Sequence, residues 1–301
     1  MSNWTPGGPA LLFCPADRPD RYRKAADRAD VVILDLEDAV TPADREAARQ
    51  ALVDNPLDPD RTIVRVNGAD TGDHARDLRA IARTDYRVLM LAKAESARHV
   101  VATGHQVIAL IETPTGAVNA LDVASAANCI GLMWGAEDLV AGLGGRSSRF
   151  GPGEADPGAY RHLARHVRSQ VRLAAAAHDR FAVDSVHLDI GDVDGLRAEV
   201  LDAVALGYQA TACIHPSQVD VVRAGYQPSD DEYRWATEVV AEAAASGGVF
   251  TFDGRMIDGP VIRQAEAIIS RRQAADLTGA SHDDAATSSV ESTTPNGRRP
   301  S

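Results

Sequence analysis

The sequence predicts an eight-stranded (β/α)8 barrel followed by a small C-terminal helical appendage. Three observations predict it: eight short apolar runs, helical stretches between them, and short connections throughout. The runs are nearly continuous rather than alternating, as expected of parallel strands covered on both faces. A doubly wound open sheet is the competing architecture, but eight strands without long insertions favour closure. The expected strands are residues 10–14, 31–36, 62–66, 88–91, 107–111, 130–134, 183–188 and 210–214.

Helical stretches separate the strands, and two of them carry start signals. Pro42 after Thr41 fits an N-cap followed by proline at the first helical position. Pro216 directs the chain out of the last strand into a helix. The expected helices of the barrel are residues 42–52, 73–83, 117–127, 160–177, 193–206 and 218–224.

The chain continues beyond the eighth strand-helix unit. Ser229 and Glu232 form a capping box that predicts a helix over residues 229–245. The Asp253-Gly254 turn predicts a short hairpin, and a second helix is expected over residues 261–275. Such an appendage is too small to fold alone, so it must pack on the barrel or on a neighbouring subunit.

These features divide the chain into three parts. The last part is rich in Ser, Thr, Asp, Gly and Pro, which predicts a disordered tail. The predicted boundaries are 10–227 for the barrel, 228–276 for the appendage and 277–301 for the tail.

Composition and charge indicate which binding partners and which cellular compartment to expect for this protein. The net charge of −12 makes nucleic acid and anionic membrane surfaces unexpected partners. No apolar stretch approaches the roughly 20 residues of a membrane span, and the polar N-terminus is unlike a signal peptide. The three cysteines lie in or at apolar runs without metal-binding spacing, which indicates buried thiols. We therefore expect a cytoplasmic protein.

Two acidic residues follow predicted strands at matching places. Glu112 closes one apolar run, and Asp138 follows the next run after a short step, 26 residues further on. The carboxyl ends of parallel strands meet at one face of a barrel, where active sites lie. Paired carboxylates there are typical ligands of Mg²⁺, which prefers oxygen and keeps positions open for water or substrate.

Further charged residues are expected at the same face. Arg65 lies within an apolar run, where an unpaired guanidinium is costly, so it either grips a substrate carboxylate or pairs with Asp35 or Glu37. Asp35 and Glu37 face the same side of their strand. Lys93 suggests a Schiff base if its pKa is lowered, but nearby acids favour charge pairing or a ligand-phosphate contact.

The remaining strand-end candidates are less specific. Glu137 stands beside Asp138, Asp189 is expected to follow the seventh strand, and His215 follows the eighth. The Gly-rich segment 142–149 carries two arginines, and it either wraps a phosphate or thioester tail or forms a mobile loop.

Taken together, several motifs resemble the citrate lyase β-subunit-like acyl-CoA lyases of the HpcH/HpaI aldolase superfamily. The resemblance covers residues 10–272. It implies a TIM barrel that forms a homotrimer or higher oligomer and handles 3-hydroxyacyl-CoA thioesters with Mg²⁺. The motifs are Leu34-Asp35-Leu36-Glu37-Asp38, Val64-Arg65-Val66-Asn67, Lys93-Ala94-Glu95, Ile111-Glu112-Thr113, Gly135-Ala136-Glu137-Asp138-Leu139, Cys213-Ile214-His215-Pro216-Ser217-Gln218 and Met256-Ile257-Asp258-Gly259-Pro260.

The resemblance also implies roles for individual residues. Glu112 and Asp138 match the metal ligands, and Arg65 matches the clamp on substrate oxygens. Asp258 matches a catalytic acid/base that a neighbouring subunit supplies; its alternative role is the N-cap of the following helix. One departure is Ala92, where many relatives have proline. The residues matched to substrate binding are Arg65, Glu112, Asp35, Glu37, Lys93, Gly135 and Ala136.

The implied activity is a Mg²⁺-dependent carbon–carbon lyase. It would cleave or form a 3-hydroxyacyl-CoA such as citramalyl-CoA or malyl-CoA, with acetyl-CoA and a 2-oxo acid as the partners of the reaction. One alternative is a malyl-CoA-type thioesterase. Another is the β-like subunit of a multisubunit citrate lyase that acts on an acyl-carrier-protein thioester.

Overall fold

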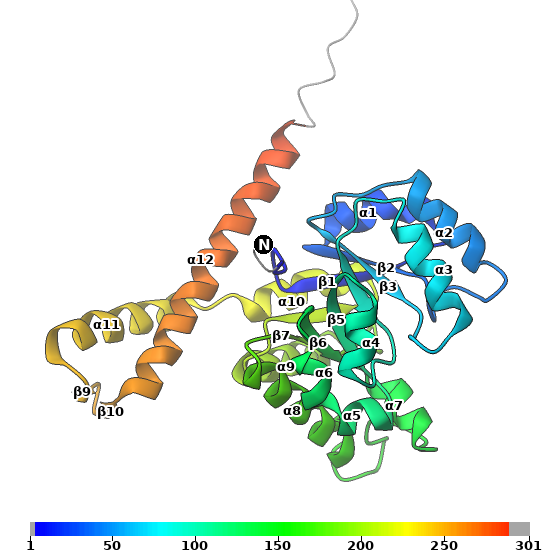
Figure 1. The fold of residues 1–301 in the computed structure, drawn as a ribbon. Coiled ribbons are helices and arrows are strands. Elements are labelled where there is room, and N and C mark those ends of the chain that lie inside the picture. The colour runs from blue at the N-terminus through cyan, green and yellow to red at the C-terminus, as the bar shows by residue number, and fades with distance from the viewer. Residues whose placement is uncertain (1–3, 289–301) are drawn as a thin grey trace, which may run out of the picture. The chain divides into compact units, whose positions relative to one another are not determined.

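The predicted barrel is confirmed: the strands pair in chain order, all parallel, and β1 closes the sheet against β8 (Figure 1). The computed structural model describes residues 4–288, with side chains up to Asp276. The strands are β1 (Ala10–Pro15), β2 (Val31–Asp35), β3 (Thr62–Val66), β4 (Val88–Leu91), β5 (Gln106–Ile111), β6 (Cys129–Trp134), β7 (Phe181–Asp184) and β8 (Ala210–Cys213).

Helices follow the strands and lie outside them (Figure 1). Together they form one compact unit that ends at Tyr226. Its helices are α1 (Pro19–Arg28), α2 (Arg45–Asp54), α3 (Gly72–Ile81), α4 (Ala97–Ala102), α5 (Pro114–Val118), α6 (Ala120–Ser125), α7 (Ala136–Gly142), α8 (His162–Ala177), α9 (Val193–Ala205), the 3₁₀ turn η1 (Pro216–Gln218) and α10 (Val219–Tyr226).

The core of this unit has two layers. Alternate strand residues such as Ile33, Ile63 and Ile108 fill the barrel interior, where they form one buried cluster. Their neighbours, such as Leu34 and Val64, pack outward against the helices in a second cluster. Each buried aliphatic side chain of this size stabilises the fold by roughly 1.5–3 kcal/mol. Both faces of the barrel sheet are covered by apolar side chains, which explains why the strands appear in the sequence as continuous apolar runs.

The seventh strand is a correction to the sequence prediction. It was expected over residues 183–188, but β7 spans Phe181–Asp184. The strand begins two residues earlier than expected because Phe181 already pairs with Gly131 on β6. The Phe181 ring packs against Gly131, where a Cβ would lie 2.6 Å from the ring. The residue at the end of β7 is consequently the buried Asp184, while Asp189 is exposed in the following loop.

Two helix predictions also need correction. The helix expected over 42–52 begins only at Arg45, because the Thr41 hydroxyl donates to Asp44 Oδ2 (2.7 Å) and Pro42 lies in the turn before it. The helix expected over 117–127 is two short helices, α5 and α6, which meet at Asn119. The Asn119 side chain donates to the Glu95 carbonyl (3.0 Å), which fixes this break.

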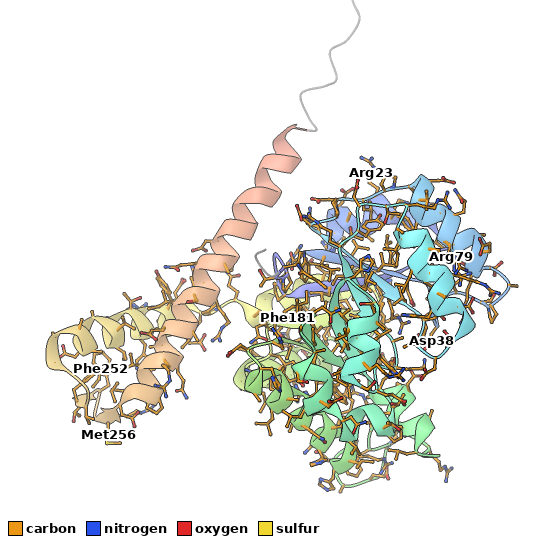
Figure 2. All side chains as sticks on the ribbon, viewed as in Figure 1. Arg23, Asp38, Arg79, Phe181, Phe252 and Met256 are labelled. Carbon is orange, nitrogen blue, oxygen red and sulfur yellow. The ribbon has the colours of Figure 1, made fainter. Side chains whose placement is uncertain are left out.

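The second compact unit begins at Gln227. Helix α11 (Asp230–Ser246) starts with the predicted Ser229–Glu232 capping box, and the hairpin β9 (Phe250–Phe252) and β10 (Arg255–Ile257) follows it. Both turn residues of the hairpin have positive φ, 47° at Asp253 and 72° at Gly254, as a two-residue primed turn requires. Figure 2 shows Phe252 and Met256 on this hairpin.

A small buried cluster joins the elements of the second unit, namely Ala236, Val239, Ile257 and Ala265. Helix α12 spans Gly259–Ser288 and so continues past residue 277, where the tail was expected to begin. The rest of the predicted tail, residues 289–301, lies outside the described residues.

Two further expectations concern the environment of the chain. All three cysteines are free and buried, as predicted. Across the part of the chain that the structure describes, every helix is too short or too polar to cross a membrane.

Candidate active site

Side chains alternate between the two faces of each strand, and this alternation places the predicted site residues at the top of the barrel interior. Val31 and Ile33 face inward, and Asp35 is the next inward position on β2. Arg65 follows Ile63 in the same way on β3, and Asp35 and Arg65 are direct register partners. Glu112 follows Ile108 and Leu110 just beyond β5. All three polar side chains are buried, and they form the top layer of the barrel interior.

Arg65 is held by two carboxylates. Its Nε and Nη2 donate to Asp35 Oδ1 and Oδ2 at 2.7 and 2.6 Å, and its Nη1 lies 3.2 Å from Glu37 Oε2. Phe13 lies under the guanidinium, 4.9 Å from ring centroid to Cζ. Burial disfavours the charge, but the hydrogen bonds to Asp35 outweigh it and raise the pKa of Arg65. The expected ion pair is present, and two of the five guanidinium N–H groups remain for a ligand.

Lys93 brings a second cation to the same cluster. Its Nζ pairs with Glu37 Oε1 and lies 3.5 Å from Asp138 Oδ1 and 3.6 Å from Asp38 Oδ2. Partial burial opposes its charge, but the hydrogen bond to Glu37 and the charges of Glu112 and Asp138 raise the pKa of Lys93 overall. A Schiff base requires a neutral amine, so the charge-pairing role predicted for Lys93 fits its surroundings. Asp38 is labelled in Figure 2.

Glu112 is the more deeply buried of the two predicted metal ligands, Glu112 and Asp138, with 3% of its surface exposed. One carboxylate oxygen, Oε1, accepts the backbone N–H of Lys93 at 3.0 Å. Burial raises the pKa of Glu112 to about 8, against the opposing effect of Arg65. A nearby dication favours the ionised carboxylate, so metal binding and deprotonation are linked here.

Gly135 leaves space beside that carboxylate. A Cβ at this position would lie 2.9 Å from Glu112 Cβ and 3.0 Å from Oε2. The Gly135 N–H donates to the Ile111 carbonyl (2.9 Å), so the close approach is fixed by the sheet. Ala136 then begins helix α7, and Asp138 lies in its first turn, where the helix dipole favours a negative charge.

The donor set at this face fits Mg²⁺. Glu112 and Asp138 supply hard carboxylate oxygens, and the space at Gly135 adjoins one of them. Among the described residues, no group of three or more His, Cys, Asp or Glu side chains is arranged to hold a metal. Mg²⁺ is bound by one or two carboxylates with water or substrate in the other positions.

Asp258 lies in the second compact unit, whereas the other predicted site residues lie in the first. Its Oδ1 is 3.4 Å from the backbone nitrogen of Val261, and its carbonyl accepts from Ile262 at 3.0 Å. This is the N-cap geometry that the sequence offered as the alternative role of Asp258. A capping carboxylate at the start of a helix is also fixed in orientation, which suits a proton-transfer group.

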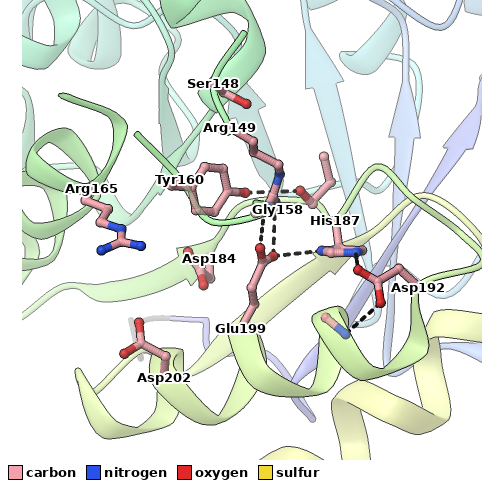
Figure 3. Close-up of polar contacts among 12 residues, drawn as sticks. Ser148, Arg149, Gly158, Tyr160, Arg165, Asp184, His187, Asp192, Glu199 and Asp202 are labelled. Carbon is pink, nitrogen blue, oxygen red and sulfur yellow. Dashed lines mark hydrogen bonds and ion pairs between the residues drawn. The ribbon is translucent and has the colours of Figure 1, made fainter. Parts of the chain in front are cut away.

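The Gly-rich segment 142–149 is tied to the barrel by its last arginine (Figure 3). Arg149 pairs with Glu199 on α9, donates to the Gly158 carbonyl (2.9 Å) and stacks on the Tyr160 ring at 3.8 Å. With these partners Arg149 has a structural role. Ser148 likewise donates a hydrogen bond to Glu137, which gives the Glu137 carboxylate a structural partner. His215 binds Ser217 at the start of η1 and acts as a local cap.

Sequence reasoning missed a second polar cluster, at the end of β7. Asp184 accepts from Trp134 Nε1 (2.6 Å) and binds Arg168. Figure 3 shows His187 beside Glu199, with His187 Nδ1 2.9 Å from Glu199 Oε2. His187 and residues of α8 and α9 line a cavity of about 470 Å³. The sequence feature that could have revealed this cluster is the presence of polar residues within the apolar run 183–188. Asp184 pairs with Arg168 and Glu199 pairs with Arg149, so we interpret this cluster as one that stabilises the fold.

Comparison with known proteins identifies the relatives of this fold and site. Residues 10–216 match the HpcH/HpaI aldolase/citrate lyase family, and residues 160–275 match the C–C bond lyases of the TIM-barrel fold. A citrate lyase subunit beta-like protein of Mycobacterium tuberculosis is 55% identical over 270 residues, or 89% of this chain and 97% of that protein. A (3S)-malyl-CoA thioesterase of Cereibacter sphaeroides is 31% identical over 286 residues, or 90% and 97%.

Solved structures agree with these matches. The crystal structure of the protein CitE from Mycobacterium tuberculosis in complex with magnesium, acetoacetate and coenzyme A has a TM-score of 0.84 and 54% identity, covering 88% of this chain and 98% of that one. A structure of the same protein with magnesium and pyruvate has a TM-score of 0.76 and 51% identity, covering 89% and 100%.

Proposed function

The chain belongs to the HpcH/HpaI aldolase/citrate lyase family, and on that premise we propose that it is a Mg²⁺-dependent carbon–carbon lyase. Its substrate is a 3-hydroxyacyl-CoA thioester such as citramalyl-CoA or malyl-CoA, cleaved to acetyl-CoA and a 2-oxo acid or formed from them. The observation that carries the proposal is the pair Glu112 and Asp138 beside a fixed Arg65. Two crystal structures of the related Mycobacterium tuberculosis protein support it, one with magnesium, acetoacetate and coenzyme A and the other with magnesium and pyruvate.

The proposed chemistry assigns each group a task. Cleavage breaks the bond between the hydroxyl-bearing carbon and the carbon next to the thioester. The hydroxyl loses its proton as its carbon becomes the ketone carbon of the 2-oxo acid. The electron pair of the broken bond passes to the carbon next to the thioester carbonyl, and that carbon takes up a proton, so the number of protons is unchanged. Bound Mg²⁺, held by Glu112 and Asp138, would act as a Lewis acid toward the substrate oxygens.

Arg65 binds the same substrate oxygens through its two remaining N–H groups, and Asp35 and Glu37 keep it in place for that contact. Gly135 and Ala136 let the substrate approach the carboxylates closely. Asp258 exchanges a proton with the carbon next to the thioester carbonyl as the general acid/base.

We infer further that Asp258 comes from a neighbouring subunit of a homo-oligomer, for which a trimer is the favoured state. The second unit supports this, because it exposes apolar side chains, including Val249 at 66% and Met256 at 68%, that a subunit contact would bury. We place the enzyme in the cytoplasm, since three free buried thiols suit a reducing compartment.

A product assay tests the proposed function. Purified protein with Mg²⁺ and citramalyl-CoA or malyl-CoA is expected to release pyruvate or glyoxylate without free thiol. Glu112→Ala and Asp258→Asn are expected to abolish that release. Because Asp258 caps α12, the thermal melting of Asp258→Asn must be measured alongside, and asparagine is the matched choice since it also caps helices.

Two alternatives give different products. Free CoA thiol with no 2-oxo acid would identify a thioesterase, the activity named for the relative from Cereibacter sphaeroides. Silence on every CoA ester, with activity restored by partner chains and an acyl-carrier-protein thioester, would identify a β-like subunit of a multisubunit lyase.

A further inference from the structure

Lys93 enters the site by an unusual backbone conformation. Val88 and Met90 face the barrel interior, so alternation along β4 would point residue 93 away from it. Its φ of 52° breaks the alternation. A lysine is strained in this region unless its surroundings hold it there. The neighbouring backbone does so, through Ala92 N–H to Val66 O (3.2 Å) and Ala94 N–H to Leu110 O (3.1 Å).

The same conformation joins Lys93 to both carboxylates of the metal pair. Its backbone N–H donates to Glu112 Oε1 at 3.0 Å, and its Nζ lies 3.5 Å from Asp138 Oδ1. Its side chain is 35% exposed, whereas Arg65 is 11% exposed and largely taken up by Asp35. Lys93 is therefore the more accessible of the two cations.

Charge at this face is unbalanced. Five acidic side chains meet two cations in the contacts described above. The acids outnumber the cations even when Glu112 is protonated, so the cluster attracts a metal ion and repels an anionic ligand. The members are Asp35, Glu37, Asp38, Glu112 and Asp138 with Arg65 and Lys93.

We propose that Lys93 is the specificity-determining residue that lets this acidic site accept a carboxylate ligand together with Mg²⁺. Its ammonium is a fixed counter-charge that weakens the attraction for a free cation and strengthens binding of the anionic 2-oxo acid. This inference rests on the proposed function, because it concerns the same Mg²⁺ and 2-oxo acid.

The two binding constants are expected to move in opposite directions when the charge is removed. In Lys93→Met, Mg²⁺ alone should bind about tenfold tighter, because a unit charge a few ångströms away no longer repels it. Pyruvate, measured in saturating Mg²⁺, should bind about tenfold weaker. A lysine that served only to hold the fold would weaken both.

Isothermal titration calorimetry on the full chain separates these cases, with MgCl₂ alone and then pyruvate as the titrants. Lys93→Gly is the second variant, because glycine adopts positive φ without strain and keeps the turn if methionine does not. Lys24→Met is the matched control, since Lys24 is the other lysine of the sequence and is exposed on α1. It should change neither constant.

Opposite shifts in both Lys93 variants support the proposal. Unchanged constants, or weakening of both, would overturn it while leaving the proposed function standing. A wild-type chain that binds no Mg²⁺ would contradict the proposed function, and this inference with it.

Discussion

At the scale of single residues, the geometry of the site depends on Gly135, which has no side chain, as much as on the side chains around it. Glu112 is fixed on one side by the Lys93 N–H and borders Gly135 on the other. Neighbouring backbone segments hold both contacts, so neither can relax by a simple rotation. These two contacts restrict the position of the Glu112 carboxylate, so the orientation of the proposed metal ligand depends on a glycine.

Gly135→Ala is expected to lower the affinity for Mg²⁺ by about tenfold or more and to cost roughly 1–3 kcal/mol of stability. The new Cβ would lie 2.9 Å from Glu112 Cβ, so the carboxylate must move. Calorimetric titration with MgCl₂ and thermal melting measure the two effects. Gly72→Ala is the control, because a Cβ there meets nothing within 4 Å. Equal Mg²⁺ affinity in both variants would refute this account of Gly135.

At the scale of elements, arginine–aspartate pairs hold neighbouring helices of the barrel together. Asp73 on α3 accepts from Arg45 and Arg49 on α2, each at 2.7 Å. Arg49 also binds the fully buried Asp77, whose other oxygen accepts from the Asn67 backbone beyond β3. These pairs therefore connect the α2–α3 contact to the strand that carries Arg65.

The stability of this contact should depend on pH in the acid range. Hydrogen bonds from Arg49 and then Arg45 lower the pKa of Asp73 to about 2, below the ordinary value of 3.8. A lowered folded-state pKa contributes stability above the unfolded value, and that contribution is lost as pH falls from about 4 to about 2. The unfolding midpoint in urea should fall across this range, and less steeply in Asp73→Asn.

The control for that comparison is Asp194→Asn, because the Asp194 side chain is 92% exposed and pairs only with Arg197 of its own helix in the ion pairs described. Its midpoint should follow the wild-type curve between pH 5 and pH 2.5. An Asp73→Asn curve parallel to wild type would show that this pair contributes no pH dependence.

At the scale of the whole molecule, the proposed reaction needs groups from two compact units. Arg65, Glu112 and Asp138 belong to the first, and Asp258 belongs to the second. If Asp258 serves the site of a neighbouring subunit, an oligomer built from two differently damaged chains contains some complete sites.

Mixing Glu112→Ala with Asp258→Asn tests this directly. Co-expressed chains carrying different tags and purified through both should regain a fraction of the wild-type lyase activity, about a quarter to a half for random assembly of a complete site from two chains. Co-expression of Glu112→Ala with the double variant is the control and should stay inactive. Inactive mixed oligomers would indicate that each chain uses its own Asp258.

The sequence by itself determined the barrel, the order of its strands and most of the residues at their ends. Hydrophobic patterning and short connections favour a closed barrel over an open sheet. A polar residue in the last positions of an apolar strand, such as Asp35 or Arg65, or just beyond it, such as Glu112, lies at the end of that strand. The sequence also predicted the Ser229 capping box, because such a cap depends on residues only three positions apart.

Only the tertiary structure decided what those residues contact. The left-handed turn at Lys93, the missing Cβ beside Glu112 and the early start of β7 at Phe181 all depend on atoms from another strand. The same is true of Arg149, which the sequence presented as a candidate ligand group and which Glu199 holds from a distant helix. Local pattern sets which face a residue occupies, but pairing and close packing are made between segments far apart in the chain.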